Sequence, residues 1–191
     1  MPPRYLHEDH VTYDADLFFP NVQSCAAVIV TSTGSTAIGG YHITVGSSTT
    51  ELDAAGQYIS AGLNGNINRV YVVGNYSRDG ASGAGANGRL GAALRVALNY
   101  PGHVWFLQSS SAWMNNGIAV AAQYSATRAG VLEIRVAPPG DWRLTGQRAV
   151  AGPEMRWVRP NGTLRLVTAT VQEAAFSGTQ NPYALGSFSV G

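Results

Sequence analysis

The chain has 191 residues, 45% of them hydrophobic, which is enough for the core of one domain with an extension. Only 12% of the residues are charged and the net charge is +1. The chain therefore lacks the excess of basic residues that binds nucleic acid, and we predict no nucleic-acid partner. A single cysteine excludes an internal disulfide scaffold, and the absence of an apolar run of about 18 residues excludes a membrane-spanning helix. We therefore expect a soluble protein without membrane contacts.

All twelve basic residues are arginine, and the chain contains no lysine. One explanation is a GC-rich genome, in which arginine codons replace lysine codons. The other is selection against lysine as the acceptor of ubiquitin, which would suit a protein that acts inside a foreign eukaryotic cytosol.

Residues 1–16 are polar, and we expect them to form an N-terminal arm. They do not show the pattern of a cleaved signal peptide. His7 and His10 have a spacing that could bind a metal, but no third ligand is near in the sequence. We therefore predict no metal site and no cofactor.

The apolar part opens with residues 15–20, and residues 25–32 ("CAAVIVTS") predict a buried strand. A turn follows, and residues 37–46 ("AIGGYHITVG") predict the returning strand of a hairpin. This hairpin would place Cys25 and His42 on neighbouring strands. The two residues are the candidate catalytic pair.

The next segment predicts a helix that ends at glycines 62 and 65, because apolar residues recur at helical spacing as far as Leu63. Thr50 and Asp53 have the spacing of an imperfect capping box at its start. The segments after this helix predict, in order, a strand, a glycine-rich loop, a second helix, a strand and a hairpin: residues 68–77, 78–88, 88–100, 103–108 and 117–137. The loop lacks the Gly-Lys-Ser/Thr sequence of a phosphate-binding loop.

Residues 138–142 ("PPGDW") indicate a boundary near residue 140. Beyond it, an Asn-Gly turn predicts a hairpin in residues 156–167, and residues 177–191 are expected to be a loop. The element order predicts a mixed α/β (α+β) fold. We expect a main domain over 17–140 and a β-rich extension over 141–191 that packs on it.

A cysteine attacks a carbonyl carbon as the thiolate, so it needs a base that accepts its proton. His42 on the adjacent strand could be that base and later return the proton to a leaving amine. The alternative is structural, because a free cysteine in an apolar strand is commonly a buried core residue.

The residues "QSCAAVIV…IGGYHITV" resemble the signature of the chemoreceptor glutamine deamidases (the CheD family). The shared features are a Ser-Cys before a small, apolar strand, a Gly-Gly pair just before the histidine, and a separation of 17 residues between Cys25 and His42. The element order downstream is also similar, and the resemblance covers residues 17–138. It implies a fold of β-sandwich-like mixed sheets flanked by helices, which the cytotoxic necrotizing factors and the Burkholderia lethal factor type of toxin share.

The third catalytic group departs from the family pattern. The receptor deamidases and the lethal factor type have a threonine six residues before the cysteine, where this chain has Phe19. A main-chain carbonyl of Phe19 or Pro20 could orient His42 instead, as the resemblance to the necrotizing factors implies, and the Asn21 side chain is another candidate. The identity of this group stays open.

We expect the oxyanion to be held by backbone N–H groups at Cys25 and in a nearby loop. Ser24 and Gln23, which stand directly before the cysteine, are the candidate substrate or oxyanion contacts. Gln23 replaces the glycine of the family pattern, and it is either a pocket residue or a surface residue at the strand end.

The resemblance implies a cysteine-dependent glutamine deamidase, which converts a glutamine of a protein substrate to glutamate without a cofactor. We expect a monomeric bacterial toxin or effector that is delivered without a cleaved leader to a target-cell cytosol, with a host GTPase or a translation factor as a plausible target. A cytoplasmic chemotaxis-type deamidase is an alternative. A noncatalytic binding module with a structural cysteine is another, and a cysteine protease or small-molecule amidase is a third.

Overall fold

The computed structural model describes residues 4–44, 47–64, 66–74, 84–108, 117–127, 129–137, 142–150, 154–158, 163–166, 169–176 and 183–189. The elements of the first half of the chain are β1 (Arg4–Tyr5), β2 (His10–Asp14), β3 (Asp16–Val22), β4 (Ala26–Ser32), β5 (Ile38–Ile43), α1 (Thr49–Gly62), β6 (Ile67–Gly74) and α2 (Ala84–Ala97). Those of the second half are β7 (Val104–Gln108), β8 (Ile118–Tyr124), β9 (Val131–Ala137), β10 (Trp142–Val150), β11 (Glu154–Val158), β12 (Thr163–Leu166), β13 (Ala169–Phe176) and β14 (Tyr183–Ser189).

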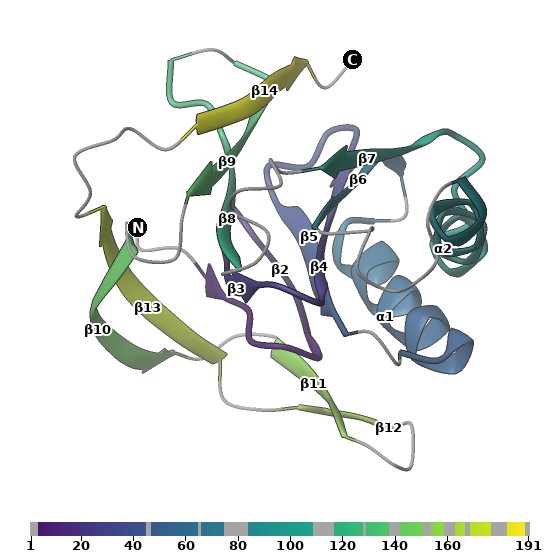
Figure 1. The fold of residues 1–191 in the computed structure, drawn as a ribbon, viewed down its shortest axis with the longest axis horizontal. Helices are drawn as coiled ribbons and strands as arrows, with labels where there is room; N and C mark the ends of the chain where they lie inside the picture. Colours follow the sequence, from purple (N-terminus) through teal and green to yellow (C-terminus); the bar gives the residue numbers. More distant parts are fainter. Residues whose placement is uncertain are drawn as a thin grey trace.

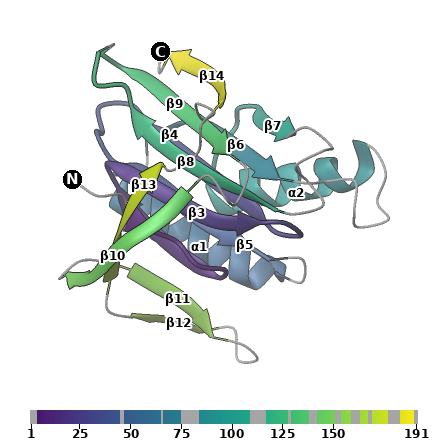
Figure 2. The same cartoon turned by 60° about the vertical axis from the view of Figure 1, so that its left-hand side comes forward.

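The strands form two mixed sheets, and the fold is of the mixed α/β class that the sequence predicts. The first sheet has the order β10-β13-β1-β3-β8-β9-β14, and the second has the order β12-β11-β2-β5-β4-β6-β7. The pairs β1–β3 and β6–β7 are parallel, and the other described pairs are antiparallel. Helices α1 and α2 lie along the second sheet on the side away from β8 and β9 (Figures 1 and 2).

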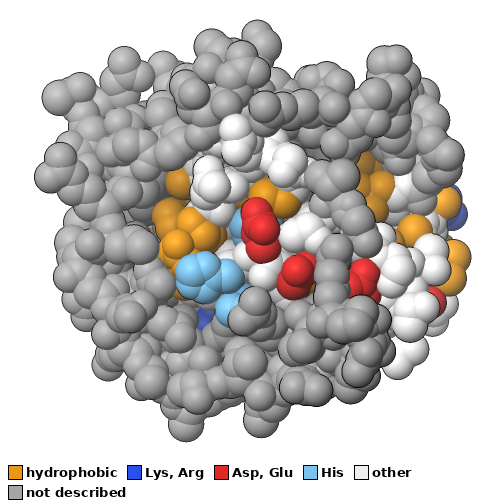
Figure 3. All heavy atoms as spheres, turned by 60° about the horizontal axis from the view of Figure 1, so that its bottom comes forward, with side chains coloured by type: hydrophobic (Ala, Val, Ile, Leu, Met, Phe, Trp, Pro, Cys, Tyr) orange, Lys and Arg blue, Asp and Glu red, His pale blue; other side chains and the backbone are white. Residues whose placement is uncertain are grey.

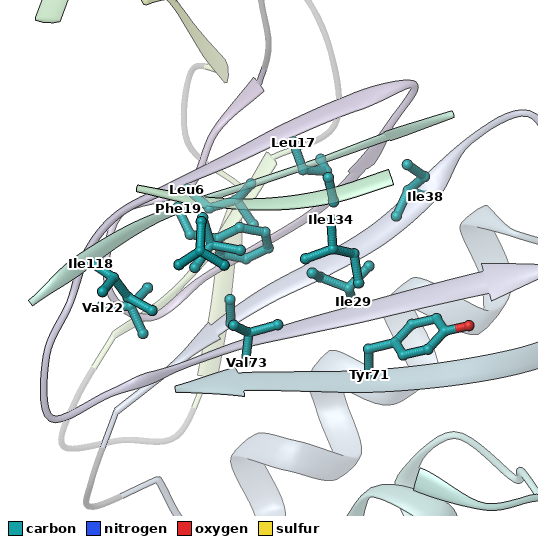
Figure 4. Close-up of a cluster of buried hydrophobic side chains, with 14 of the residues drawn as sticks. Leu6, Leu17, Phe19, Val22, Ile29, Ile38, Tyr71, Val73, Ile118 and Ile134 are labelled. Carbon is teal, nitrogen blue, oxygen red and sulfur yellow. The ribbon is translucent and has the colours of Figure 1, made fainter. Parts of the chain in front are cut away.

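The main core lies between the two sheets. Side chains of β3, β8 and β9 in the first sheet meet side chains of β4, β5 and β6 in the second (Figure 4). A second core lies between the other face of the second sheet and the helices, where Leu52 and Ile59 of α1 and Leu94 of α2 are buried. The domain therefore has three layers: sheet, sheet and helices.

Strand β4 is buried along its whole length. Ala27 and Ile29 belong to the core between the sheets, whereas Ala26 and Val28 belong to the core under the helices. Both faces of the strand are covered, which explains why its sequence is a continuous apolar run without alternation.

The Gly-Gly pair before His42 allows β5 to be packed closely on both faces. A Cβ atom on Gly39 would lie 2.4 Å from Ile59 Cγ2 of α1, and one on Gly40 would lie 2.6 Å from Leu17 Cδ1 of the first sheet. Each glycine faces a different layer because successive strand residues point to opposite faces.

Several elements confirm the prediction from the sequence. The hairpin of β4 and β5 pairs Ala27 with His42, and β8 pairs with β9 in the predicted second hairpin. Strands β11 and β12 are antiparallel neighbours, as the predicted hairpin requires, and the Asn-Gly pair between them lies outside the described residues. Neither helix in the described ranges is long and apolar enough to cross a membrane.

Residues 4–16 do not form the expected arm, and residues 1–3 lie outside the described part of the chain. Strand β1 belongs to the first sheet, and β2 lies between β11 and β5 in the second. The partly buried ion pair between Arg4 and Asp14, with a distance of 2.6 Å between Nη2 and Oδ2, is part of the same segment. The polar composition of this segment did not indicate strands. Strands β1 and β2 are short, and they are stabilised by pairing with neighbouring strands rather than marked by an apolar periodicity in their own sequence.

Two further predictions were wrong. Helix α1 begins two residues earlier than predicted, with Ser48 as N-cap and a capping box to Glu51 in place of Thr50 and Asp53. The expected loop over 177–191 contains β14, which pairs with the edge of β9. Its pairing with a strand about 50 residues earlier is a long-range contact that local sequence does not encode.

Candidate functional site

The register of the β4–β5 hairpin brings Cys25 and His42 together. Ala27 lies directly opposite His42, and Cys25 precedes Ala27 by two residues, so it stands diagonally across on the same face. The distance between Cys25 Sγ and His42 Nε2 is 2.9 Å. Both side chains are buried, with 5% and 1% exposure respectively. The sequence prediction thus paired two residues that are in direct contact.

The second imidazole nitrogen is held by the main chain of Leu6. His42 Nδ1 lies 2.9 Å from the Leu6 carbonyl oxygen. A carbonyl can only accept a hydrogen bond, so Nδ1 carries the proton and Nε2 offers its lone pair to the thiol. This is the tautomer that a base for Cys25 requires.

The orienting group is a main-chain carbonyl, but it comes from a different residue than the sequence suggested. We expected Phe19, Pro20 or Asn21 at Nδ1, and the structure has Leu6 there. The Phe19 ring meets the imidazole edge to face, with 5.9 Å between the ring centroids. Leu6 was missed because it lies 36 residues from His42 in a segment predicted to be an arm.

The loop between β1 and β2, residues 6–9, crosses from the first sheet to the second directly over His42. Its start is fixed by the bond from the Leu6 N–H to the Phe18 carbonyl, 2.8 Å. Its end is fixed by the bond from the Asp9 N–H to the His42 carbonyl, also 2.8 Å. The Thr44 hydroxyl donates to the Asp9 carboxylate at 2.9 Å. The loop therefore holds His42 through both its ring and its main chain.

A bulge in β3 shapes the other side of the site. The pairing of β3 with β8 shifts register between Phe19 and Val22, and Asn21 has a positive φ of 49°. A Cβ on Gly117 would lie 2.5 Å from Asn21 Oδ1, so the Asn21 side chain is packed against that backbone rather than at His42. Pro20, which has no N–H to donate, is accommodated by this bulge.

Main-chain groups surround the sulfur. The Asn21 carbonyl lies 3.7 Å from Cys25 Sγ. Main-chain hydrogen bonds from Gln23 and Cys25 lower the pKa of the thiol, so these N–H groups face the sulfur. Ser24 is exposed and Gln23 is half-buried. These main-chain donors belong to the bend at residues 23–25, next to Cys25.

Burial governs the charge state of the pair. The pKa of Cys25 is raised to about 11, mainly by desolvation; the Glu8 charge also raises it, and the main-chain donors at Gln23 and Cys25 oppose the rise. Desolvation also lowers the pKa of His42 to about 4, despite the bond to Leu6. The pair is therefore a neutral thiol and a neutral imidazole at pH 7.

A pocket of about 520 Å³ opens beside the pair. Its walls come from the β1–β2 loop, the β3 bulge and β5: Tyr5, His7, Glu8, His10, Pro20, Asn21 and His42. His7 and His10 have ring centroids 5.4 Å apart, at one side of it. Histidine, acidic and hydrophobic side chains gather on the face shown in Figure 3. No cluster of three potential metal ligands occurs among the described residues.

Comparisons with known proteins do not place this chain in a family. The chain matches no protein-family model, and a search of curated proteins finds no significant match. The argument for function therefore rests on the arrangement of Cys25, His42 and their neighbours.

Proposed function

We propose that this protein is a cysteine-dependent amidase that deamidates a glutamine side chain of a protein substrate. The observation that carries the proposal is the chain of contacts from Cys25 Sγ to His42 Nε2 and from His42 Nδ1 to the Leu6 carbonyl, each 2.9 Å. Nucleophile, base and orienting acceptor are the three parts of a thiol hydrolase site. The resemblance to the glutamine deamidases and the deamidase toxins supplies the substrate class.

In the first half-reaction the Cys25 sulfur attacks the carboxamide carbon while its proton passes to His42 Nε2. Because both groups are neutral at rest, transfer of the proton accompanies formation of the C–S bond. The N–H groups of Gln23 and Cys25 donate to the oxyanion. His42 then returns the proton to the amide nitrogen, and ammonia leaves a thioester on Cys25.

In the second half-reaction water attacks the thioester. His42 accepts a proton from the water, and the collapse of the intermediate restores the Cys25 thiol and releases a glutamate side chain. The sum is carboxamide plus water to carboxylic acid plus ammonia. An amine in place of water would give transglutamination through the same thioester.

The experiment is mass spectrometry of folded candidate targets, Rho-family GTPases and translation factors among them, after incubation with the protein. Deamidation adds about one dalton to a glutamine-containing peptide, and the gain must be absent with Cys25→Ser and with His42→Ala. A gain that persists with Cys25→Ser, or no gain on any target, would refute the proposed reaction.

One observation favours a noncatalytic alternative. Cys25 is only 5% exposed, belongs to the core between the sheets and has a raised pKa. A binding module that uses Cys25 and His42 as a buried hydrogen-bonded pair would share these features. In that case Cys25→Ser and His42→Gln would lower the stability of the fold and change no reaction.

A further inference from the structure

Glu8 is a carboxylate in the wall of the pocket beside Cys25 and His42, and neither the resemblance nor the mechanism above gives it a role. Its side chain is exposed and lines the pocket together with His42 and Asn21. His42 and Asn21 contact the sulfur, through His42 Nε2 at 2.9 Å and the Asn21 carbonyl oxygen at 3.7 Å. The charge of Glu8 raises the pKa of the Cys25 thiol, as expected for a carboxylate in the wall of the same pocket. Among the residues that line this pocket it is the one carboxylate, and none of them is an arginine.

The position of Glu8 is set by its neighbours in the chain. The Asp9 N–H donates a hydrogen bond to the His42 carbonyl, and the His10 N–H donates one to the His7 carbonyl at 3.0 Å. The main chain on either side of Glu8 is therefore tied down over the catalytic pair. The main chain thus holds Glu8 in the wall of the pocket that His42 and Asn21 also line.

A primary carboxamide at Cys25 makes specific demands. Its oxygen needs donors, which the N–H groups of Gln23 and Cys25 supply, and its NH₂ group needs acceptors for two N–H bonds. A carboxylate has about four acceptor positions, so Glu8 can accept an amide N–H of a substrate in the pocket. His42 Nε2 remains available for the proton transfer.

We propose that Glu8 is a specificity-determining residue that accepts an N–H of a primary carboxamide and selects it against carboxylates and against amides whose nitrogen carries no hydrogen. This inference rests on the proposed function. A carboxylate at the same place would be repelled by the Glu8 charge, and it would leave Glu8 without a donor. The same repulsion favours release of the glutamate product. An amide nitrogen that carries no hydrogen would likewise leave Glu8 without a donor.

The test uses three reagents with the same reactive carbon: iodoacetamide, N,N-dimethyl-2-iodoacetamide and iodoacetate. They differ in offering N–H donors, a neutral amide without N–H, and a carboxylate. Cys25 is the sole cysteine of the chain, so the rate of alkylation by mass spectrometry reports one site. Each rate is divided by the rate of the same reagent with N-acetylcysteine, which removes its intrinsic reactivity.

We expect wild type to favour iodoacetamide over the other two reagents. Glu8→Gln should reduce the preference for iodoacetamide over iodoacetate by about tenfold to a hundredfold, the range for loss of a hydrogen bond to a charged group. Asp53→Asn, which removes the same charge from α1, should keep the wild-type preference. The thermal midpoint of each variant shows that it is folded.

Two results would overturn the inference: an unchanged preference in Glu8→Gln, or an equal acceleration with all three reagents, which would mean that Glu8 only raises the pKa of the thiol. Failure of the proposed function is a separate outcome. In that case the reagent preference depends on Glu8, but no glutamine gains a dalton in any target.

Discussion

The charge state of the Cys25–His42 pair leads to a prediction about the reactivity of the thiol. If the pair is neutral, Cys25 alkylation should be slow at pH 7 and should accelerate steadily as the pH rises. A thiolate–imidazolium pair, as in many cysteine hydrolases, would instead react at a rate independent of pH around neutrality. The pH slope therefore distinguishes the two states, whereas burial of the sulfur lowers the rate without changing the slope.

The magnitude follows from the pKa of about 11 for Cys25, against 9.0 for an ordinary thiol. At pH 7 the thiolate fraction should be about a hundredfold lower than for that ordinary thiol. Below pH 11 each added pH unit should raise the rate about tenfold, while an ordinary thiol levels off above pH 9. The groups that act on the pair are Glu8 at the sulfur and His7, His10 and Asp9 at the imidazole.

The assay is the rate of iodoacetamide modification between pH 6 and 10, followed on the intact protein, with N-acetylcysteine as the reference. His42→Gln should leave the tenfold slope in place, because the thiol is already protonated in the wild type. A rate that is flat between pH 6 and 9 in wild type, and that becomes steep in His42→Gln, would refute the neutral pair.

Three further predictions concern stability. Unfolded His42 binds a proton near pH 6.5 but the folded residue only near pH 4, so stability should fall by about 3 kcal/mol as the pH drops through this window, and His42→Gln should remove that fall in urea titrations. Gly40→Ala should cost about 1–3 kcal/mol by overpacking against Leu17, whereas Gly91→Ala, whose Cβ would meet Phe106 at 3.4 Å, should be neutral or stabilising in thermal melts. Ser48→Ala should destabilise α1 by about 1 kcal/mol, and Ser48→Asp, which keeps a capping oxygen, should not. Equal effects in either of the last two pairs would contradict the packing and capping assignments.

The pairing of Cys25 with His42 could be predicted because its determinants are local. Two apolar strands joined by a short turn form an antiparallel hairpin, and the alternation of faces then decides which residues meet. In the sequence, Gly39 and Gly40 are only part of the family-like pattern. The physical need for glycine at these positions is the close packing of β5 by a helix on one face and a sheet on the other, and that packing exists only when the three layers are assembled.

Leu6 and Glu8 depended on the tertiary structure. They lie 36 and 34 residues before His42, in a polar segment with no periodicity, and nothing local points them at the hairpin. They reach the site because β1 joins the first sheet, β2 joins the second, and the loop between them must cross at His42. The sequence by itself determined which cysteine and which histidine meet. The stacking of the two sheets decided which carbonyl orients the imidazole, how far the pair is desolvated and which carboxylate lines the pocket beside it, because each of these is a long-range contact between elements that local sequence does not pair.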